Sequence, residues 1–240
     1  MTTTRPANPA IPKATPRPSV ERIRELVTPR RIAVIGASNT SNWSHFTYHN
    51  LTKGGFDGDL WLVNRRGEPF QGHPTYTTLA DVPGTPDLAV LLTGAHSIEA
   101  VLADCRETGI RNLIVLSGGF GEAGPDGAAL QQRIVEQARD AGQLLLGPNN
   151  LGFINTSART AAFAHMTEIP LFAGPVGVAS QSGALSIYLI PYMASRGVGT
   201  SVCVTVGNEA MLSAVEPFRR SDCACPHSFF HASRFRNCFS

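Results

Sequence analysis

The sequence predicts an α/β fold in which helices cover both faces of a parallel sheet. Short, almost wholly apolar runs alternate with stretches of helical periodicity along most of the chain. Only 16% of the 240 residues are charged, against a typical share of about 25%, which favours strands buried on both faces. Hydrophobic residues make up 42%, so a substantial core is expected and a wholly disordered chain is excluded.

The predicted first domain spans residues 30–150. Six of the 17 prolines precede it, so residues 1–29 are predicted to be a disordered, Pro-rich leader that ends in one short helical turn, VERIREL. Strands and helices are then expected in alternation. The predicted strands are 31–36, 60–64, 87–93, 112–119 and 143–147, and the predicted helices are 44–53, 97–108 and 126–141.

A second pattern of the same kind follows. A strand over 176–180, a helix over 183–196 and a strand over 200–206 form one βαβ unit and no more. Two strands are too few for a parallel sheet. Residues 151–215 are therefore predicted to be an incomplete second α/β domain.

The segment 216–240 differs from everything before it. It holds five of the twelve phenylalanines and three of the five cysteines, with neither helical nor strand alternation. Its thiols and imidazoles could form a metal site, but a Cys-x-Cys pair is tighter than zinc sites use. We favour a replaced or out-of-frame C-terminus and expect no metal. The candidate ligands are Cys223, Cys225, His227, His231 and Cys238.

Charge and cysteine usage exclude several classes of function. The net charge of +2 arises at the two ends, because residues 31–215 hold ten basic and fourteen acidic side chains. Without a basic stripe, no nucleic-acid partner is expected. No apolar run reaches the roughly 18–20 residues of a membrane span, and the N-terminus lacks a signal-peptide core, so we expect a cytoplasmic protein without membrane contact. Cys105 and Cys203 are expected to be buried free thiols.

Candidate binding residues follow the carboxyl ends of the predicted strands, where open α/β sheets bind their ligands. The loop 36–39 brings backbone close to a ligand, and the helix after it offers N–H groups to a phosphate. The arginines after the second strand suit a phosphate, or form only a solvated basic turn. The small residues after the next two strands fit the same crevice, or simply make turns. These candidates are Gly36, Ala37, Ser38, Asn39, Asn64, Arg65, Arg66, Thr93, Gly94, Ser117, Gly118 and Gly119.

The same loops argue against a dinucleotide site. The G-x-G-x-x-G fingerprint is absent, since the glycines that follow Gly36 are Gly54 and Gly55. The second strand ends in Asn64 and two arginines, where such sites have an acidic residue for the ribose hydroxyl. A dinucleotide-binding oxidoreductase is therefore the least favoured alternative.

A second anion site is expected at the start of the helix 183–196. Ser180, Gln181, Ser182 and Gly183 place two hydroxyls and unpaired backbone N–H groups at a helix N-terminus, which suits a phosphoryl group. On these residues alone, an ordinary serine N-cap is the simpler interpretation.

Six motifs in order resemble the NDP-forming acyl-CoA synthetases, the family of ADP-forming acetate–CoA ligases and relatives of the succinyl-CoA synthetase alpha subunit. They extend over about residues 30 to 215 and read IAVIGAS, LVNRRG, LIVLSGGFGE, GPNNLGFIN, VGVASQSGAL and VTVGNEA. The resemblance implies a Rossmann-like, parallel-sheet CoA-binding domain followed by the start of a flavodoxin-like domain. It also implies an acid–CoA ligase reaction that proceeds through an acyl phosphate and a phosphohistidine.

The resemblance also implies roles for the candidate residues. The loop 36–39 and Arg65 or Arg66 would contact CoA, and the loops 93–94 and 117–119 would flank its pantetheine arm. Asn149, in the segment 147–149, would lie near the acyl-transfer centre. The segment 180–183 would face the phosphorylated histidine.

Departures from the family pattern limit what the chain is expected to do. Ser44 and His45 stand where relatives commonly have a glycine, and Asn150 stands where they usually have a cysteine. The family's phosphohistidine, its supporting glutamate and the nucleotide-grasping portion belong to segments absent from this sequence. We therefore expect CoA and a small carboxylic acid as ligands, ATP or ADP with Mg only through a missing domain or a partner subunit, and no complete reaction by this chain alone. The alternative is a CoA-binding module that acts with a partner chain.

Overall fold

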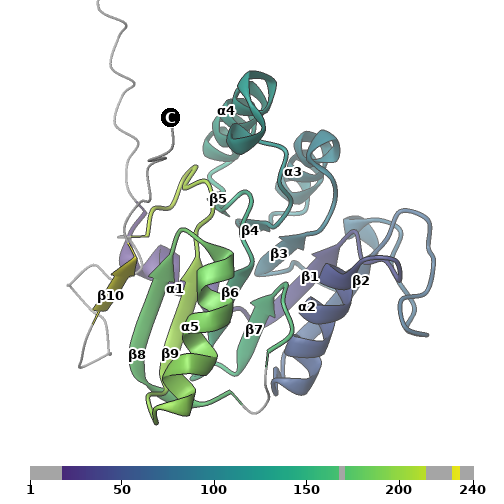
Figure 1. Ribbon diagram of the computed structural model, residues 1–240. Coiled ribbons are helices and arrows are strands. Elements are labelled where there is room, and N and C mark those ends of the chain that lie inside the picture. The colour runs from purple at the N-terminus through teal and green to yellow at the C-terminus, as the bar shows by residue number, and fades with distance from the viewer. Residues whose placement is uncertain (1–17, 168–170, 215–228, 233–240) are drawn as a thin grey trace, which may run out of the picture.

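Two five-stranded sheets lie side by side in the computed structural model (Figure 1). The structure describes residues 18–167 and 171–214, and the backbone of residues 229–232. The strand order is β2-β1-β3-β4-β5 in the first sheet and β10-β8-β9-β6-β7 in the second.

The first sheet is parallel throughout, as its nearly continuous apolar runs predict. All four residues of β3 and all four of β4 are buried. Strand β1 lies between β2 and β3, so Val34 of β1 is opposite Leu62 of β2 on one side and Val90 of β3 on the other. Its strands are β1 (Arg31–Ile35), β2 (Asp59–Val63), β3 (Leu88–Leu91), β4 (Asn112–Val115) and β5 (Leu144–Leu146).

Helices cover both faces of this sheet. Two of them pack on one face through side chains such as Leu102 and Ile134. The other two pack on the opposite face, together with the second sheet, through side chains such as Leu26 and Leu51. The first pair is α3 (Ile98–Glu107) and α4 (Pro125–Asp140), and the second pair is α1 (Val20–Val27) and α2 (Asn42–Lys53). Short 3-10 turns span Leu79–Asp81, Ala95–Ser97 and Gly121–Ala123.

The expected helical turn before Pro29 is helix α1. The Ser19 hydroxyl caps it by accepting a hydrogen bond from the N–H of Arg22 at 3.2 Å. Ile23 and Leu26 are buried in the core, so the folded part of the chain begins before residue 30. Residues 1–17 of the predicted leader lie outside the described residues.

The second sheet corrects the expectation of a single βαβ unit. The predicted unit is present, but an antiparallel hairpin and one further parallel strand extend it to five strands. The hairpin turn lacks an Asn-Gly or Asp-Gly signal; instead, Asn155 Oδ1 accepts from the N–H of Ala158 and Arg159 has φ +48°. The elements are β6 (Gly152–Asn155), β7 (Thr160–Phe163), β8 (Ala173–Ser180), α5 (Gly183–Ser195), β9 (Thr200–Thr205) and β10 (Phe229–Ala232).

Strand β10 also corrects the expectation that the segment 216–240 has no regular element. Its backbone pairs in parallel with residues 177–180 of β8, whose edge offers unpaired N–H and C=O groups. The side chains of the candidate metal ligands in that segment lie outside the described residues.

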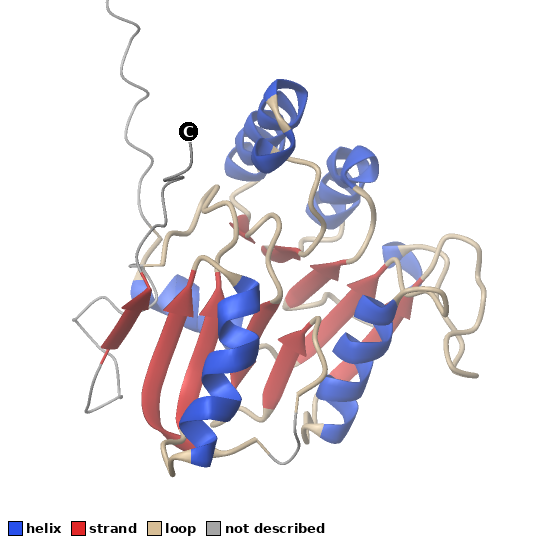
Figure 2. Ribbon diagram, in the orientation of Figure 1, coloured by secondary structure: helices blue, strands red, loops and turns tan. Residues whose placement is uncertain are grey.

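The two sheets share one hydrophobic core. Phe153, Ala162 and Val204 of the second sheet pack with the face of the first sheet that α1 and α2 cover. Asn50 of α2 donates from Nδ2 to the carbonyl of Phe163, which ties the helix to β7. Helix α5 covers the other face of the second sheet (Figure 2).

Two further predictions, on the cysteines and on membrane-spanning segments, can be compared with the described residues. Cys105 and Cys203 are buried and free, as predicted. Within the described ranges, no helix combines the length and the apolar character needed to cross a membrane.

Candidate functional site

A pocket of about 410 Å³ opens at the carboxyl ends of β1, β2 and β3. We call it the carboxyl-edge pocket. Three of the predicted loops meet there, contributing Gly36, Ala37, Ser38, Asn64, Arg65, Arg66, Thr93 and Gly94. Sequence reasoning missed other lining residues, among them Thr40, Glu68, Thr77 and Ser97. The role of these side chains as ligand contacts stays a prediction.

At Gly36 the loop after β1 comes close to Thr93, two residues past the end of β3. The φ of Gly36 is +87°, and a Cβ at this position would lie 2.8 Å from Cγ2 of Thr93 and 3.2 Å from the Thr93 nitrogen. A side chain would therefore combine a strained backbone with a steric clash. Glycine lets the backbone of this loop lie close to the edge of the sheet, where a ligand can contact it.

Ser44 gives the loop after Gly36 a contact that the family glycine could not make. Its Oγ accepts a hydrogen bond from the N–H of Ser38 at 3.2 Å, and the residue is buried. Ser41 caps α2 by accepting from the N–H of Ser44 at 3.3 Å. One N–H of the predicted phosphate loop is thus already bound within the protein.

Asn39 lies outside the lining of the carboxyl-edge pocket. Its Nδ2 donates to the carbonyl of Pro69 at 2.8 Å, and its Oδ1 accepts from the N–H of Gln71 at 3.0 Å. His45 supports the same connection, with Nε2 2.9 Å from the Asn39 carbonyl and Nδ1 2.7 Å from the Gln71 amide nitrogen. These two residues hold the β2 loop against the start of α2.

The turn after β2 presents two arginines at the pocket. Asn64 ties this turn to the first loop by donating from Nδ2 to the Ala37 carbonyl at 2.9 Å. The side chains of Arg65 and Arg66 are 66% and 81% exposed, each with a carboxylate oxygen 3.8 Å away. Exposed pairs of this kind are worth about 0–1 kcal/mol, so both guanidinium groups can turn toward an anion.

Two buried hydroxyls at this edge have no hydrogen-bond partner among the described residues. They are Oγ1 of Thr93, at the end of β3, and Oγ of Ser117, at the end of β4. Leaving a buried polar group unpaired is unfavourable by about 1–3 kcal/mol. A ligand that reaches this edge can supply the missing partners.

The loop 117–119 lies apart from the carboxyl-edge pocket and against a second set of turns. The N–H of Asn149 donates to the Ser117 carbonyl at 3.0 Å, and the N–H of Asn208 donates to the Pro148 carbonyl at 2.9 Å. Gly207 has φ +57°, and a Cβ there would overlap the carbonyl oxygens of Pro148 and Asn149. The structure therefore brings the predicted Ser117, Gly118 and Gly119 beside Asn149.

Asn150, which replaces the family cysteine, joins the two sheets. It is buried, and its Nδ2 donates to the carbonyl of Val115, at the end of β4, at 2.8 Å. Its Oδ1 accepts from the N–H of Gly152, at the start of β6, at 2.6 Å.

The segment 180–183 begins α5, and its serines are already paired. Ser182 is the N-cap, with Oγ accepting from the N–H of Leu185 at 3.2 Å, which confirms the simpler interpretation of this residue. The hydroxyl of Ser180 donates to the Ser182 carbonyl at 2.9 Å and accepts from the Ser182 N–H at 3.1 Å. Gln181 extends toward Glu209, with Nε2 3.5 Å from Oε2.

Sequence reasoning did not single out Glu122 and Asn208, although both lie inside the motifs LIVLSGGFGE and VTVGNEA. Oε1 of Glu122 accepts from the N–H groups of Gly119 and Phe120, and Oε2 accepts from Nδ2 of Asn208. Burial raises the pKa of Glu122, but hydrogen bonds from Asn208 and the backbone outweigh it, so the pKa is lowered.

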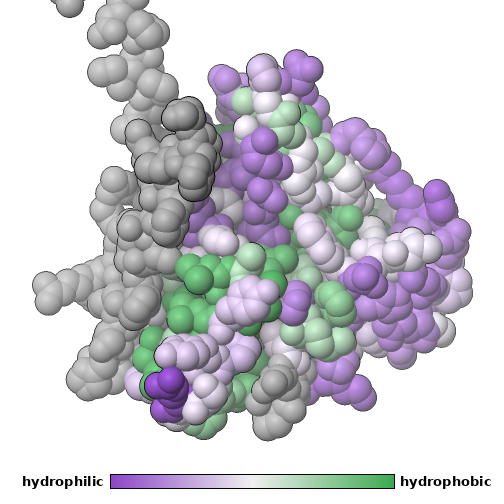
Figure 3. Space-filling view, viewed as in Figure 1, coloured by the Kyte–Doolittle hydropathy of each residue, from purple (hydrophilic) through white to green (hydrophobic). Residues whose placement is uncertain are grey.

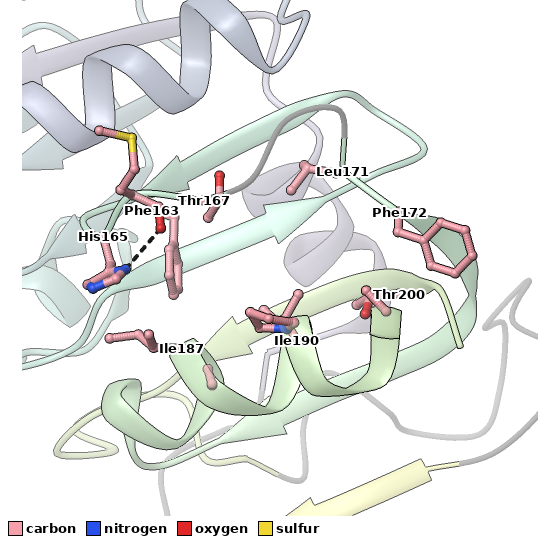
Figure 4. Close-up of a pocket in the computed structure, with 12 residues that line it drawn as sticks. Phe163, His165, Thr167, Leu171, Phe172, Ile187, Ile190 and Thr200 are labelled. Carbon is pink, nitrogen blue, oxygen red and sulfur yellow. Dashed lines mark hydrogen bonds between the residues drawn. The ribbon is translucent and has the colours of Figure 1, made fainter. Parts of the chain in front are cut away.

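A second pocket, of about 210 Å³, lies along α5 and shares no residue with the carboxyl-edge pocket (Figure 4). Its lining is mainly apolar and includes Phe163, Leu171, Ile187 and Ile190. Figure 4 shows His165 at its rim, where Nδ1 lies 3.0 Å from the Met166 carbonyl. No residue of this lining was predicted, and neither arginine nor lysine is among its residues.

A family model described as the CoA binding domain matches residues 30–156, more than half of the chain. This chain belongs to the CoA-binding domain family. A second model, described as the succinyl-CoA ligase like flavodoxin domain, matches residues 173–220. The matches agree with a CoA-binding domain built on the first sheet and a flavodoxin-like domain beginning in the second.

The curated relatives that this chain matches are longer proteins. The chain is 33% identical over 193 residues to the alpha subunit of ADP-forming acetate–CoA ligase I from Pyrococcus furiosus, a match covering 78% of this chain and 41% of the relative. It is 34% identical over 204 residues to a trans-feruloyl-CoA synthase from an unknown prokaryotic organism, covering 83% of this chain and 29% of the relative. The chain thus spans less than half the length of these relatives.

The chain is also similar to solved structures of enzymes that are longer than it is. The dinucleotide forming acetyl-coenzyme A synthetase 1 of Candidatus Korarchaeum cryptofilum superposes with a TM-score of 0.75 at 33% identity, covering 81% of this chain and 42% of that one. The same enzyme has been solved in complex with phosphate and ADP.

Proposed function

We propose that this chain is the CoA-binding portion of an ADP-forming acyl-CoA synthetase, with CoA held along the carboxyl edge of the first sheet. The observation that carries the proposal is the carboxyl-edge pocket, where a close-approach glycine, two exposed arginines and an unpaired buried hydroxyl meet. A relative named as a subunit of an ADP-forming CoA ligase and another named as a CoA synthase support it.

The chemistry of CoA fits the groups at this edge. Its phosphates suit Arg65 and Arg66, whose planar guanidinium groups bind phosphate through two parallel hydrogen bonds. Its flexible arm carries amides, which suit the unpaired hydroxyls of Thr93 and Ser117. The arm would then run past the loop 117–119 and bring the thiol toward Asn149.

The proposed reaction joins that thiol to an acyl phosphate. The sulfur attacks the acyl carbon, the bond from that carbon to the phosphate oxygen breaks, and the leaving phosphate takes up the thiol proton, so that a thioester and inorganic phosphate are formed. The N-terminus of α5, which begins at Gly183, would stabilise the phosphate charge through its dipole. The loop 147–149 would exclude water and orient the thiol.

The remaining steps are assigned to protein outside this chain. Phosphorylation by ATP, with Mg, needs a nucleotide-grasping domain or partner subunit, and the substrate is a small carboxylic acid. The extra length of the relatives and the ADP-bound solved structure support this division.

Calorimetric titration tests the proposal. We expect CoA to bind and NADH not to bind, since the dinucleotide fingerprint is absent. The double substitution Arg65→Ala/Arg66→Ala should weaken CoA binding by about tenfold or more, because charged hydrogen bonds contribute about 1.5–3 kcal/mol each. Arg159→Ala is the matched control, because Arg159 pairs with Asp57 away from the carboxyl-edge pocket. Tight NADH binding without CoA heat would contradict the proposal.

A further inference from the structure

Hydrogen bonds on either side of the turn 207–209 connect the loop 117–120 of the first sheet with the start of α5 on the second. It begins at Glu122, whose Oε1 accepts from the N–H of Gly119 at 2.6 Å and of Phe120 at 3.2 Å. The other oxygen, Oε2, accepts from Nδ2 of Asn208, which lies 86 residues further along the chain. One carboxylate therefore holds both the loop and the turn 207–209.

Asn208 and Glu209 continue the connection. Oδ1 of Asn208 accepts from Nδ2 of Asn149 at 3.2 Å. Oε2 of Glu209 accepts from Nε2 of Gln181 at 3.5 Å, one residue before the α5 N-cap. Oε1 of Glu209 accepts from the N–H of Ala214 at 2.9 Å, so both of its oxygens are engaged.

The backbone of this turn is held in an unfavourable conformation. Glu209 has φ +55°, a region that only a few per cent of non-glycine residues occupy. Such a conformation persists where the surroundings fix it, and it concentrates at functional sites. The geometry of the turn thus depends on the contacts that Glu122, Asn208 and Gln181 make around it.

We propose that Glu122 and Asn208 are positioning residues that couple CoA binding at the first sheet to the N-terminus of α5 on the second. The inference rests on the proposed function, because CoA must contact the loop 117–119 to act on this pair. CoA that orders the loop fixes the Glu122 carboxylate. The carboxylate fixes Asn208, and the turn 207–209 then holds Gln181 and the start of α5 in place.

The hydrogen bond between Asn208 and Glu122 has a fixed donor and a fixed acceptor, so exchanging the two chemical groups tests it. A carboxylate can only accept, and the Asn208 amide nitrogen donates to it. Asn208→Asp would put two carboxylates against each other and break the connection. Adding Glu122→Gln to that variant restores this contact in reverse, because the new amide at position 122 donates to the new carboxylate at position 208. The contact that Nδ2 of Asn208 makes with Oε1 of Gln131 at 2.9 Å is not restored, so the rescue is expected to be partial.

The experiment measures hydrogen exchange of residues 180–186 with and without saturating CoA, alongside calorimetry for CoA affinity. Five forms of the full chain are compared: wild type, Glu122→Gln, Asn208→Asp, the double variant and Glu136→Gln. The last is the matched control, because Glu136 is exposed on α4 and its Oε1 accepts from Nε2 of Gln132 at 2.9 Å, one turn away on the same helix.

We expect CoA to slow exchange at 180–186 in the wild type by about fivefold, the lower end of typical coupling between sites. Asn208→Asp should abolish this slowing and weaken CoA binding by about threefold to tenfold. The double variant should regain at least half of the slowing, and Glu136→Gln should match the wild type. A pair that merely supported the fold would change the melting temperature and leave the CoA-dependent slowing unchanged.

Several results would overturn the inference. Unchanged slowing in Asn208→Asp would show that the pair does not transmit binding, even with CoA bound. Loss without rescue in the double variant would assign the effect to general damage. If melting curves show that Asn208→Asp fails to fold, the Glu122→Gln variant decides the question. We expect it to lose part of the CoA-dependent slowing of exchange, and slowing equal to that of the wild type would contradict the inference. A wild type that binds no CoA would refute the proposed function itself, and the inference with it.

Discussion

The two sheets differ in how completely helices cover them. The first has α3 and α4 on one face and α1, α2 and the second sheet on the other. The outer face of the second sheet is covered, among the described residues, by α5. Helix α5 has no charged side chain, yet Tyr188 is 76% and Tyr192 57% exposed, and Figure 3 shows hydrophobic residues gathered around it. A helix that is apolar all round is normally buried, whereas α5 exposes part of its surface. The first sheet is therefore covered from solvent more completely than the second.

The largest expected effect separates the two regions by stability. Leu91→Ala in β3 removes a fully buried side chain and should lower the free energy of unfolding by about 2–5 kcal/mol. Tyr188→Ser on α5 should change it by no more than about 0.5 kcal/mol, because the ring is mostly exposed. Urea unfolding followed by circular dichroism measures both, and equal losses would refute the comparison.

A pair of glycines sharpens the same contrast. Gly36 and Gly197 both have positive φ, but a Cβ at Gly36 would strike Thr93, whereas a Cβ at Gly197 meets nothing within 4 Å. Gly197→Ala should destabilise by about 1–2 kcal/mol through its backbone alone. Gly36→Ala should destabilise more and weaken CoA binding as well. Thermal melts and calorimetry measure both effects. A Gly36→Ala protein with normal CoA affinity would contradict the close approach of CoA to the backbone at Gly36.

Asp87 makes the stability of the first sheet depend on pH. It accepts hydrogen bonds from the Arg31 guanidinium at 2.6 Å and from the N–H groups of Arg30 and Arg31. Burial raises the pKa of Asp87, but these hydrogen bonds and the Arg31 charge outweigh it, so the folded pKa lies below its ordinary value.

A lowered folded pKa stabilises the protein above the unfolded pKa, and this contribution is lost as pH falls through the folded value. The wild type should therefore lose stability below about pH 4. Asp87→Asn should be less stable at pH 7, by about 1 kcal/mol, and its stability should fall less steeply in acid. Denaturant unfolding between pH 3 and 7 measures this, and parallel pH profiles would contradict it.

The smallest expected effect compares the two buried thiols, Cys105 on α3 behind the first sheet and Cys203 on β9 in the second. Burial raises the pKa of Cys105 and of Cys203 to about 12, so both react with alkylating reagents only when the structure opens. Cys203 should be labelled faster, because α5 is the helix that covers its side of the sheet in the part of the chain that the structure describes. Timed alkylation with peptide mass spectrometry gives the order, and faster labelling of Cys105 would reverse the comparison.

The sequence predicted the first sheet well because each strand is a nearly continuous apolar run, and periodicity reports such strands directly. It missed the β6–β7 hairpin, whose turn is held by Asn155 and Arg159 rather than by a glycine signal. The carboxyl-edge pocket followed from the rule that parallel strands present their carboxyl ends together. The contact of Glu122 with Asn208 had no such rule, because its partners are distant in sequence and meet only through the packing of the two sheets.

The most direct test of CoA binding at the first sheet is a hydrogen-exchange map of the whole chain with and without CoA. Protection is expected in the carboxyl-edge loops, at residues 36–40, 64–67 and 93–97, and not along the apolar pocket at 187–194. Protection along 187–194 with none in the carboxyl-edge loops would place the ligand on α5 and contradict the account.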